Sequence, residues 1–162
     1  FSHHLMSRGE MQMLYCVDPW IDDFGSNHQE GYFDPNGTNR MEECATHLKE
    51  FIDIGHVELV KATGLEASAE IPDGYMDFVY LDGDHSLEGI FHDIYAWTPK
   101  VRLGGVISGH DYKDGPKSGM KDYWGNHLDY SVKSVVDYYC ARYGYKLNYV
   151  GGRILSWWFV KT

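Results

Sequence analysis

Acidic and imidazole side chains stand directly after three apolar runs of this sequence. Asp18 follows the first run, Asp82 and His85 follow a later one, and His110 and Asp111 follow the next. A carboxylate in such a place can accept hydrogen bonds from a ribose diol. Carboxylates together with imidazoles can bind a divalent cation or act as a general base. Which chemistry is available depends on how the chain brings these side chains together.

Simple structural roles compete with these chemical ones. Asp18 precedes a proline, and Asp-Pro is common in the turns that end strands. Asp84 and Ser86 both stand where a helix N-terminus needs a side-chain acceptor, so one of them is expected to be a cap. The His-Asp pair after the later run can simply stiffen its loop. Asp82 has no such explanation, which makes it the strongest single candidate.

The spacing of apolar residues predicts the elements that position these side chains. It predicts helices over 41–52, 65–69, 87–98 and 132–143, and strands at 13–17, 57–62, 76–81, 106–108, 146–150 and 154–160. Strands that alternate with helices are typical of a mostly parallel sheet. Gly151 and Gly152 separate the last two strands, which indicates an antiparallel hairpin. Ligands bind at the carboxyl ends of strands in open sheets of this kind, where Asp18, Asp82 and His110 all fall.

Two polar stretches contain no strong pattern. Residues 22–38 are rich in Gly and Asn and are expected to form a loop. Residues 113–129 carry three glycines and many charges. We expect no regular structure there, and we predict a mobile lid over the substrate site, because such a segment buries little apolar area.

Composition narrows the class of protein. The 162 residues suit a single domain, and no apolar run approaches the ~20 residues of a membrane-spanning helix. A net charge of -10 argues against a nucleic-acid partner and fits a small-molecule substrate, although solubility alone explains it equally well. Three scattered cysteines without zinc spacing indicate reduced thiols and a cytoplasmic location. Trp20 and Tyr112 lie just beyond strand ends, where an aromatic ring can stack on an adenine or a substrate.

Three segments resemble a known enzyme family: MDFVYLDGDHS at 76–86, LGGVI at 103–107 and GHDY at 109–112. They are similar to class I S-adenosylmethionine-dependent methyltransferases, in particular small-molecule O-methyltransferases related to the catechol and macrolide-sugar types. VDPW at 17–20 resembles the end of that family's second strand, and WFVK at 158–161 resembles its last strand. The resemblance spans nearly the whole chain. It implies an α/β, Rossmann-like methyltransferase sheet, mostly parallel, with helices on both faces and a C-terminal antiparallel hairpin.

The resemblance also implies a cofactor and site residues. S-adenosylmethionine would lie with its ribose on Asp18, beside Trp20, with its adenine near Thr63 and Gly64, and with Asp82 also in contact. Asp82, His110 and Asp111 align with the ligands of a divalent cation, Mg or similar, in the metal-dependent members. Such a metal would acidify a substrate hydroxyl. The second of these three positions is a histidine, His110, which departs from the pattern of the metal-dependent members. The alternative to a metal site is that His85 or His110 acts as a general base without a metal.

A second departure concerns the start of the chain. The glycine-rich first-strand motif that holds the methionine part of the cofactor is not found before Asp18. We therefore expect one methyltransferase-like domain over 1–162 that is truncated at its N-terminus and lacks the first strand. The strands ending at Asp18 and at Leu81 would then pair directly, with a homodimer as a further way to cover the gap. This fragment would bind S-adenosylmethionine weakly or undetectably.

Two other classes of function stay open on the sequence. One is a non-catalytic α/β module that serves binding or assembly. The other is a hydrolase that uses a metal cluster built from Asp82, Asp84, His85, His110 and Asp111. Fold analogy alone does not decide between a methyltransferase and these alternatives.

Overall fold

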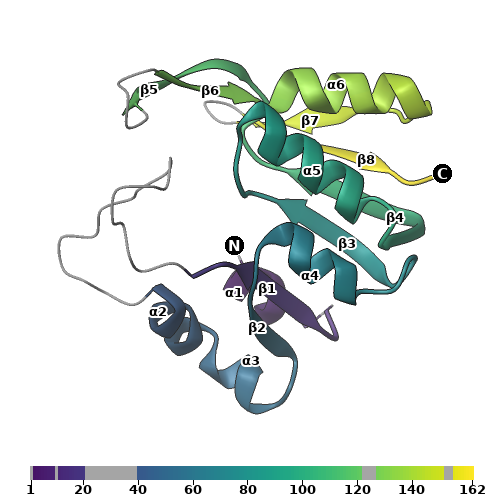
Figure 1. The fold of residues 1–162 in the computed structure, drawn as a ribbon. Coiled ribbons are helices and arrows are strands. Elements are labelled where there is room, and N and C mark those ends of the chain that lie inside the picture. The colour runs from purple at the N-terminus through teal and green to yellow at the C-terminus, as the bar shows by residue number, and fades with distance from the viewer. Residues whose placement is uncertain (1, 10, 21–39, 122–126, 152–154) are drawn as a thin grey trace. The chain divides into compact units, whose positions relative to one another are not determined.

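The computed structural model describes residues 2–9, 11–20, 40–121, 127–151 and 155–162 (Figure 1). The chain divides into two compact units, Phe1–Thr63 and Gly64–Thr162, whose relative placement is not determined. Each unit is therefore described by itself. The predicted loop at 22–38 lies outside the described residues. No helix in the described ranges is long and apolar enough to cross a membrane.

The first unit is built on two parallel strands. β1 (Leu14–Asp18) pairs with β2 (Val57–Lys61), and α1 (Ser2–Ser7), α2 (Arg40–His47) and α3 (Lys49–Asp53) complete the unit. Its core is a cluster around Met6, Leu48 and Val57. The single helix expected over 41–52 is two helices, because the backbone leaves helical geometry at Leu48. The side chain of Leu48 is 2% exposed, so the break coincides with its burial in the core.

The second unit contains a four-stranded sheet in the order β3-β4-β8-β7. β3 (Met76–Leu81) and β4 (Val101–Gly109) are parallel, and β8 (Ser156–Val160) and β7 (Asn148–Val150) continue the sheet antiparallel. The helices of this unit are α4 (Gly64–Glu70), α5 (Leu87–Trp97) and α6 (Val132–Tyr143). Ile94, Ile107, Trp157 and Phe159 are fully buried and form part of the core. The predicted C-terminal hairpin is confirmed.

The prediction for residues 113–129 is wrong in one respect. β5 (Asp114–Lys121) and β6 (His127–Ser131) pair antiparallel and form a separate two-stranded sheet that leads into α6 (Figure 1). Backbone hydrogen bonds hold such a ladder, so it can form without the apolar alternation that a half-buried strand shows. That this hairpin moves as a lid stays a prediction.

β1 and β3 are the two strands that were expected to border the missing first strand. Among the described residues, β1 pairs with β2 alone and β3 with β4 alone. β1 and β3 belong to the two units whose relative placement is not determined, so the expected pairing of the strand that ends at Asp18 with the strand that ends at Leu81 stays a prediction. Within its own unit, each strand forms backbone hydrogen bonds with the strand that follows it in the chain.

Candidate active site

Parallel pairing of β3 and β4 places the polar residues that follow them at one edge of the sheet. Leu81 and Gly109, the last residues of the two strands, are partners in the ladder. The His110 N–H then donates to the Leu81 carbonyl at 3.0 Å. Asp82 and His110 therefore leave the sheet side by side.

A glycine is required just before His110. A Cβ on Gly109 would lie 2.6 Å from Cζ2 of Trp157 and 2.7 Å from the Leu81 carbonyl oxygen. The Trp157 indole also donates from Nε1 to the His110 carbonyl at 3.2 Å. The core of the sheet thus fixes the backbone from which the His110 imidazole projects.

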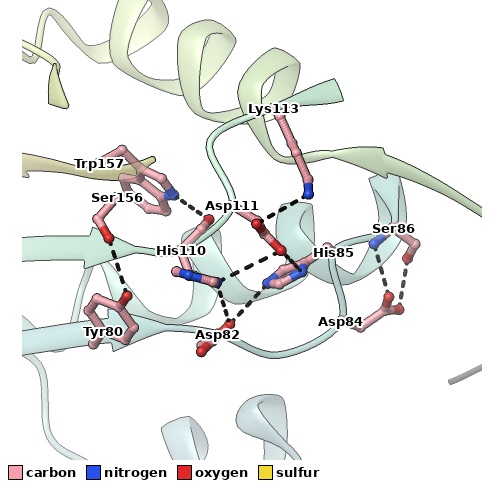
Figure 2. A network of polar contacts seen from close by, with 10 residues as sticks. All are labelled: Tyr80, Asp82, Asp84, His85, Ser86, His110, Asp111, Lys113, Ser156 and Trp157. Carbon is pink, nitrogen blue, oxygen red and sulfur yellow. Dashed lines mark hydrogen bonds and ion pairs between the residues drawn. The ribbon is translucent and has the colours of Figure 1, made fainter. Parts of the chain in front are cut away.

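Four side chains converge at this edge, and we call them the polar cluster: Asp82, His85, His110 and Asp111 (Figure 2). Nδ1 of His110 lies 3.4 Å from Oδ1 of Asp82 and 3.8 Å from Oδ2 of Asp111. Nε2 of His85 lies 3.4 Å from the same Asp82 oxygen, and its Nδ1 lies 3.5 Å from the same Asp111 oxygen. The convergence expected for Asp82, His110 and Asp111 is confirmed, while the role of each residue stays a prediction.

The cluster has an exposed side and a buried side. The Asp82 and His110 side chains are 53% and 30% exposed, whereas those of His85 and Asp111 are each 11% exposed. The close imidazole of His85 and the charge of the nearby His110 hold the pKa of Asp82 below its usual value, although partial burial opposes this. Asp82 is therefore a stable anion beside an accessible imidazole.

Two residues that the sequence did not single out, Lys113 and Tyr130, lie beside the polar cluster. Lys113 Nζ lies 3.3 Å from Oδ1 of Asp111 and 3.9 Å from the centre of the Tyr130 ring. The Tyr130 ring packs against the His85 imidazole at a centroid distance of 5.6 Å. Lys113 begins the stretch expected to be irregular and Tyr130 directly follows it, so nothing in the sequence pattern placed them beside the cluster. Asp111 itself has a positive φ of 48°, which an aspartate tolerates better than most residues.

The helix-capping role expected for Asp84 or Ser86 is confirmed. Asp84 accepts hydrogen bonds from the Ser86 N–H at 2.9 Å and from the Ser86 hydroxyl at 2.7 Å. The Ser86 hydroxyl in turn accepts from the Gly89 N–H at 3.1 Å, so Ser86 is the N-cap of α5. Asp84 thus serves the start of a helix and points away from the polar cluster (Figure 2).

The polar cluster does not fit a divalent cation. Within the described ranges, no group of three or more His, Cys, Asp or Glu residues is arranged so that it could hold a metal ion. The geometry gives the reason, since the imidazole of His85 directs one nitrogen at Asp82 and the other at Asp111. The expected metal site of Asp82, His110 and Asp111 is therefore not supported.

Asp18 and Trp20 form a tight turn at the end of β1. The Trp20 N–H donates to Oδ1 of Asp18 at 2.6 Å, and Trp20 has a positive φ of 49°. Trp20 is 8% exposed, and its buried Nε1 has no hydrogen-bond partner in the part of the chain that the structure describes. These two residues and Thr63 belong to the first unit, so the structure does not test whether they meet Asp82.

Gly64 begins α4 and lies against Asp93 of α5, a residue that the sequence gave no reason to select. A Cβ on Gly64 would lie 2.7 Å from Oδ1 of Asp93, and a Cβ on Gly83 would lie 3.1 Å from its Oδ2. Burial, together with the negative charge of Asp84, raises the pKa of Asp93 to about 6. Tyr112, expected to offer a stacking surface, is instead buried against Tyr149 and donates its hydroxyl to Asp137.

Comparison with known proteins shows the same fold in enzymes. Residues 1–112 match the model of the family described as Methyltransferase domain. A protein from Corynebacterium glutamicum matches with a TM-score of 0.58 and 13% identity, over 93% of this chain and 61% of its own. An O-methyltransferase family protein from Burkholderia thailandensis matches with a TM-score of 0.55 and 13% identity, over 76% of this chain and 41% of its own.

A further match is the precorrin-6y C5,15-methyltransferase from Geobacter metallireducens. Its TM-score is 0.54 and its identity 15%, over 93% of this chain and 67% of its own. No curated protein sequence shows significant similarity to the chain. The chain spans less than two thirds of the length of the first two structures. The likenesses confirm the predicted Rossmann-like α/β fold.

Proposed function

Since the chain belongs to the Methyltransferase domain family, we propose that it transfers a methyl group from S-adenosylmethionine to a hydroxyl group of a small-molecule acceptor. The observation that carries the proposal is the contact of the His110 imidazole with the Asp82 carboxylate at the carboxyl edge of β3 and β4. An imidazole oriented by a carboxylate is a suitable general base for a hydroxyl.

The described contacts of Asp18 fit the ribose of this cofactor. Its Oδ1 is engaged by the Trp20 backbone, which fixes the carboxylate and leaves Oδ2 to accept from a ribose hydroxyl. The buried Nε1 of Trp20, without a partner among the described residues, is a donor that a polar group of the cofactor would satisfy. Thr63, Gly64 and Asp82 are retained as cofactor contacts on the strength of the family resemblance.

When bound, S-adenosylmethionine supplies a methyl group on a positively charged sulfur. A neutral hydroxyl is a weak nucleophile, so the protein must take its proton. His110 is suited to this task because its Nδ1 faces Asp82, which leaves Nε2 on the other side of an accessible ring. Asp82, whose pKa is lowered, stays ionised and stabilises the imidazolium that forms.

His85 is less suited to be that base. Both of its nitrogens face carboxylate oxygens, and its side chain is 11% exposed against 30% for His110. The net charge of -10 favours a small acceptor over a nucleic acid, since phosphates would be repelled.

The test is transfer of an isotopically labelled methyl group from S-adenosylmethionine to a panel of small alcohols and phenols. We expect His110→Gln to lower the rate by ~10²–10⁴-fold, the usual contribution of a general base. His92→Gln, which changes an exposed imidazole of α5, is the matched control and should retain the rate. An unchanged rate in His110→Gln would show that another group is the base. Label in RNA but in none of the small acceptors would overturn the acceptor class.

A further inference from the structure

The imidazole of His85 bridges the two carboxylates of the polar cluster. Its Nε2 lies 3.4 Å from Asp82 and its Nδ1 lies 3.5 Å from Asp111, on opposite sides of the ring (Figure 2). The Ser131 N–H donates to the His85 carbonyl at 3.0 Å, and the Tyr130 ring packs on the imidazole. The position of the imidazole is therefore fixed by a hydrogen bond to the His85 backbone and by the packing of the Tyr130 ring.

The other carboxylate oxygen of Asp111 also has a partner within the protein. Lys113 Nζ lies 3.3 Å from Oδ1 of Asp111, while His85 faces its Oδ2. A hard divalent cation would need these carboxylate oxygens at ~2.0–2.6 Å. The oxygens instead face side-chain nitrogens of His85 and Lys113.

We propose that the His85 imidazole occupies the place of a divalent cation between Asp82 and Asp111, so that the site works without a metal ion. The inference rests on the function proposed above and deepens it, because it assigns this chain to a metal-independent mode of hydroxyl activation. It also has a consequence for a variant. Without the imidazole, Asp82, Asp111 and His110 are left as two carboxylates and one nitrogen, a donor set that Mn²⁺ accepts.

The experiment is a titration with MnCl₂, followed by the electron paramagnetic resonance signal of free Mn²⁺, so it does not depend on methyl transfer. We expect no specific site in the wild-type protein. His85→Ala should gain one saturable site that is at least ~10-fold tighter than any binding to the wild type. The double variant His85→Ala with Asp111→Asn should lose that site. His92→Ala, which removes an exposed imidazole elsewhere, controls for non-specific binding to this acidic protein.

Two outcomes would overturn the proposal. One is a specific Mn²⁺ site in the wild-type protein that Asp82→Asn abolishes. The other is a folded His85→Ala protein with no gain of binding, confirmed in His85→Ser, with folding checked by circular dichroism. Should neither variant fold, the wild-type titration with and without Asp82→Asn still decides the question. If the wild-type protein transfers no methyl group but His85→Ala gains the Mn²⁺ site, then the proposed function fails while this inference holds.

Discussion

Two carboxylates separated by one glycine are held in contrasting ways. Asp84 accepts two short hydrogen bonds, at 2.9 and 2.7 Å, from its neighbour Ser86. Asp82 faces imidazole nitrogens of His85 and His110 at 3.4 Å, and His110 follows another strand. The short hydrogen bonds of Asp84 to the next residue but one stabilise the local backbone and use both of its oxygens. The longer contacts of Asp82 leave its carboxylate able to interact with a further group. The difference separates the carboxylate that starts a helix from the carboxylate that we assign to chemistry.

Exchanging each carboxylate for its amide tests this contrast directly. Asp82→Asn keeps the size of the side chain but removes the charge that orients and stabilises the His110 imidazole. We expect the rate of labelled-methyl transfer to fall by ~10²-fold or more, with little change in melting temperature. Asp84→Asn keeps an acceptor for the Ser86 N–H and should leave the rate close to that of the wild type. Equal losses of rate in the two variants would remove the distinction between the two sites.

A third carboxylate, Asp93, extends the comparison because it has neither kind of partner among the residues that the structure describes. Its pKa is raised to about 6 from 3.8, mainly by burial and then by the charge of Asp84. As the pH rises from about 4 to about 6, the unfolded chain ionises first, so the free energy of unfolding falls, and above pH 6 the loss is complete. Asp93→Asn should remove this loss. Its stability gain over the wild type should grow across this pH range to at most about 3 kcal/mol, at about 1.4 kcal/mol per pKa unit.

Asp73 provides the control of opposite sign. A hydrogen bond from Lys100 lowers the pKa of this exposed carboxylate. Asp73→Asn should therefore lower stability at neutral pH, and the difference from the wild type should vanish as the pH falls below about 4. Chemical denaturation at a series of pH values measures both variants. A pH-independent effect of Asp93→Asn would show that this carboxyl is not perturbed by its surroundings.

What the sequence predicted well depends on local patterns. The apolar run at Met76–Leu81 is β3, Ser86 caps α5, and the helix expected over 132–143 is α6. The meeting of Asp82 with His110 was also predictable, because parallel neighbouring strands bring their carboxyl ends to one edge. Each of these inferences needs only the residues of one segment, or the pairing of two adjacent strands.

What the sequence did not predict depends on contacts between distant segments. Lys113 precedes β5 and Tyr130 lies in β6, and these two segments pair without the apolar alternation that would have predicted strands. The expected metal site is not supported for a similar reason, since a motif gives the donors but not the position of the His85 ring between them. Asp93 was missed because a polar residue within a helix is normally solvated, whereas the close approach of Gly64 and Gly83 to its carboxylate is a contact between separate segments.

The smallest effect belongs to the helix start beside the polar cluster. Ser86→Ala removes the acceptor for the Gly89 N–H and one hydrogen bond to Asp84. We expect a loss of about 1 kcal/mol in the free energy of unfolding, the usual value for an N-cap, and near wild-type methyl transfer. Ser86→Thr retains the hydroxyl and should restore most of the stability, as denaturant titration would measure. A large loss of rate in Ser86→Ala, rescued by threonine, would mean that the cap positions His85 and its neighbours. The helix start and the polar cluster would then be one functional unit instead of two adjoining structures with separate roles.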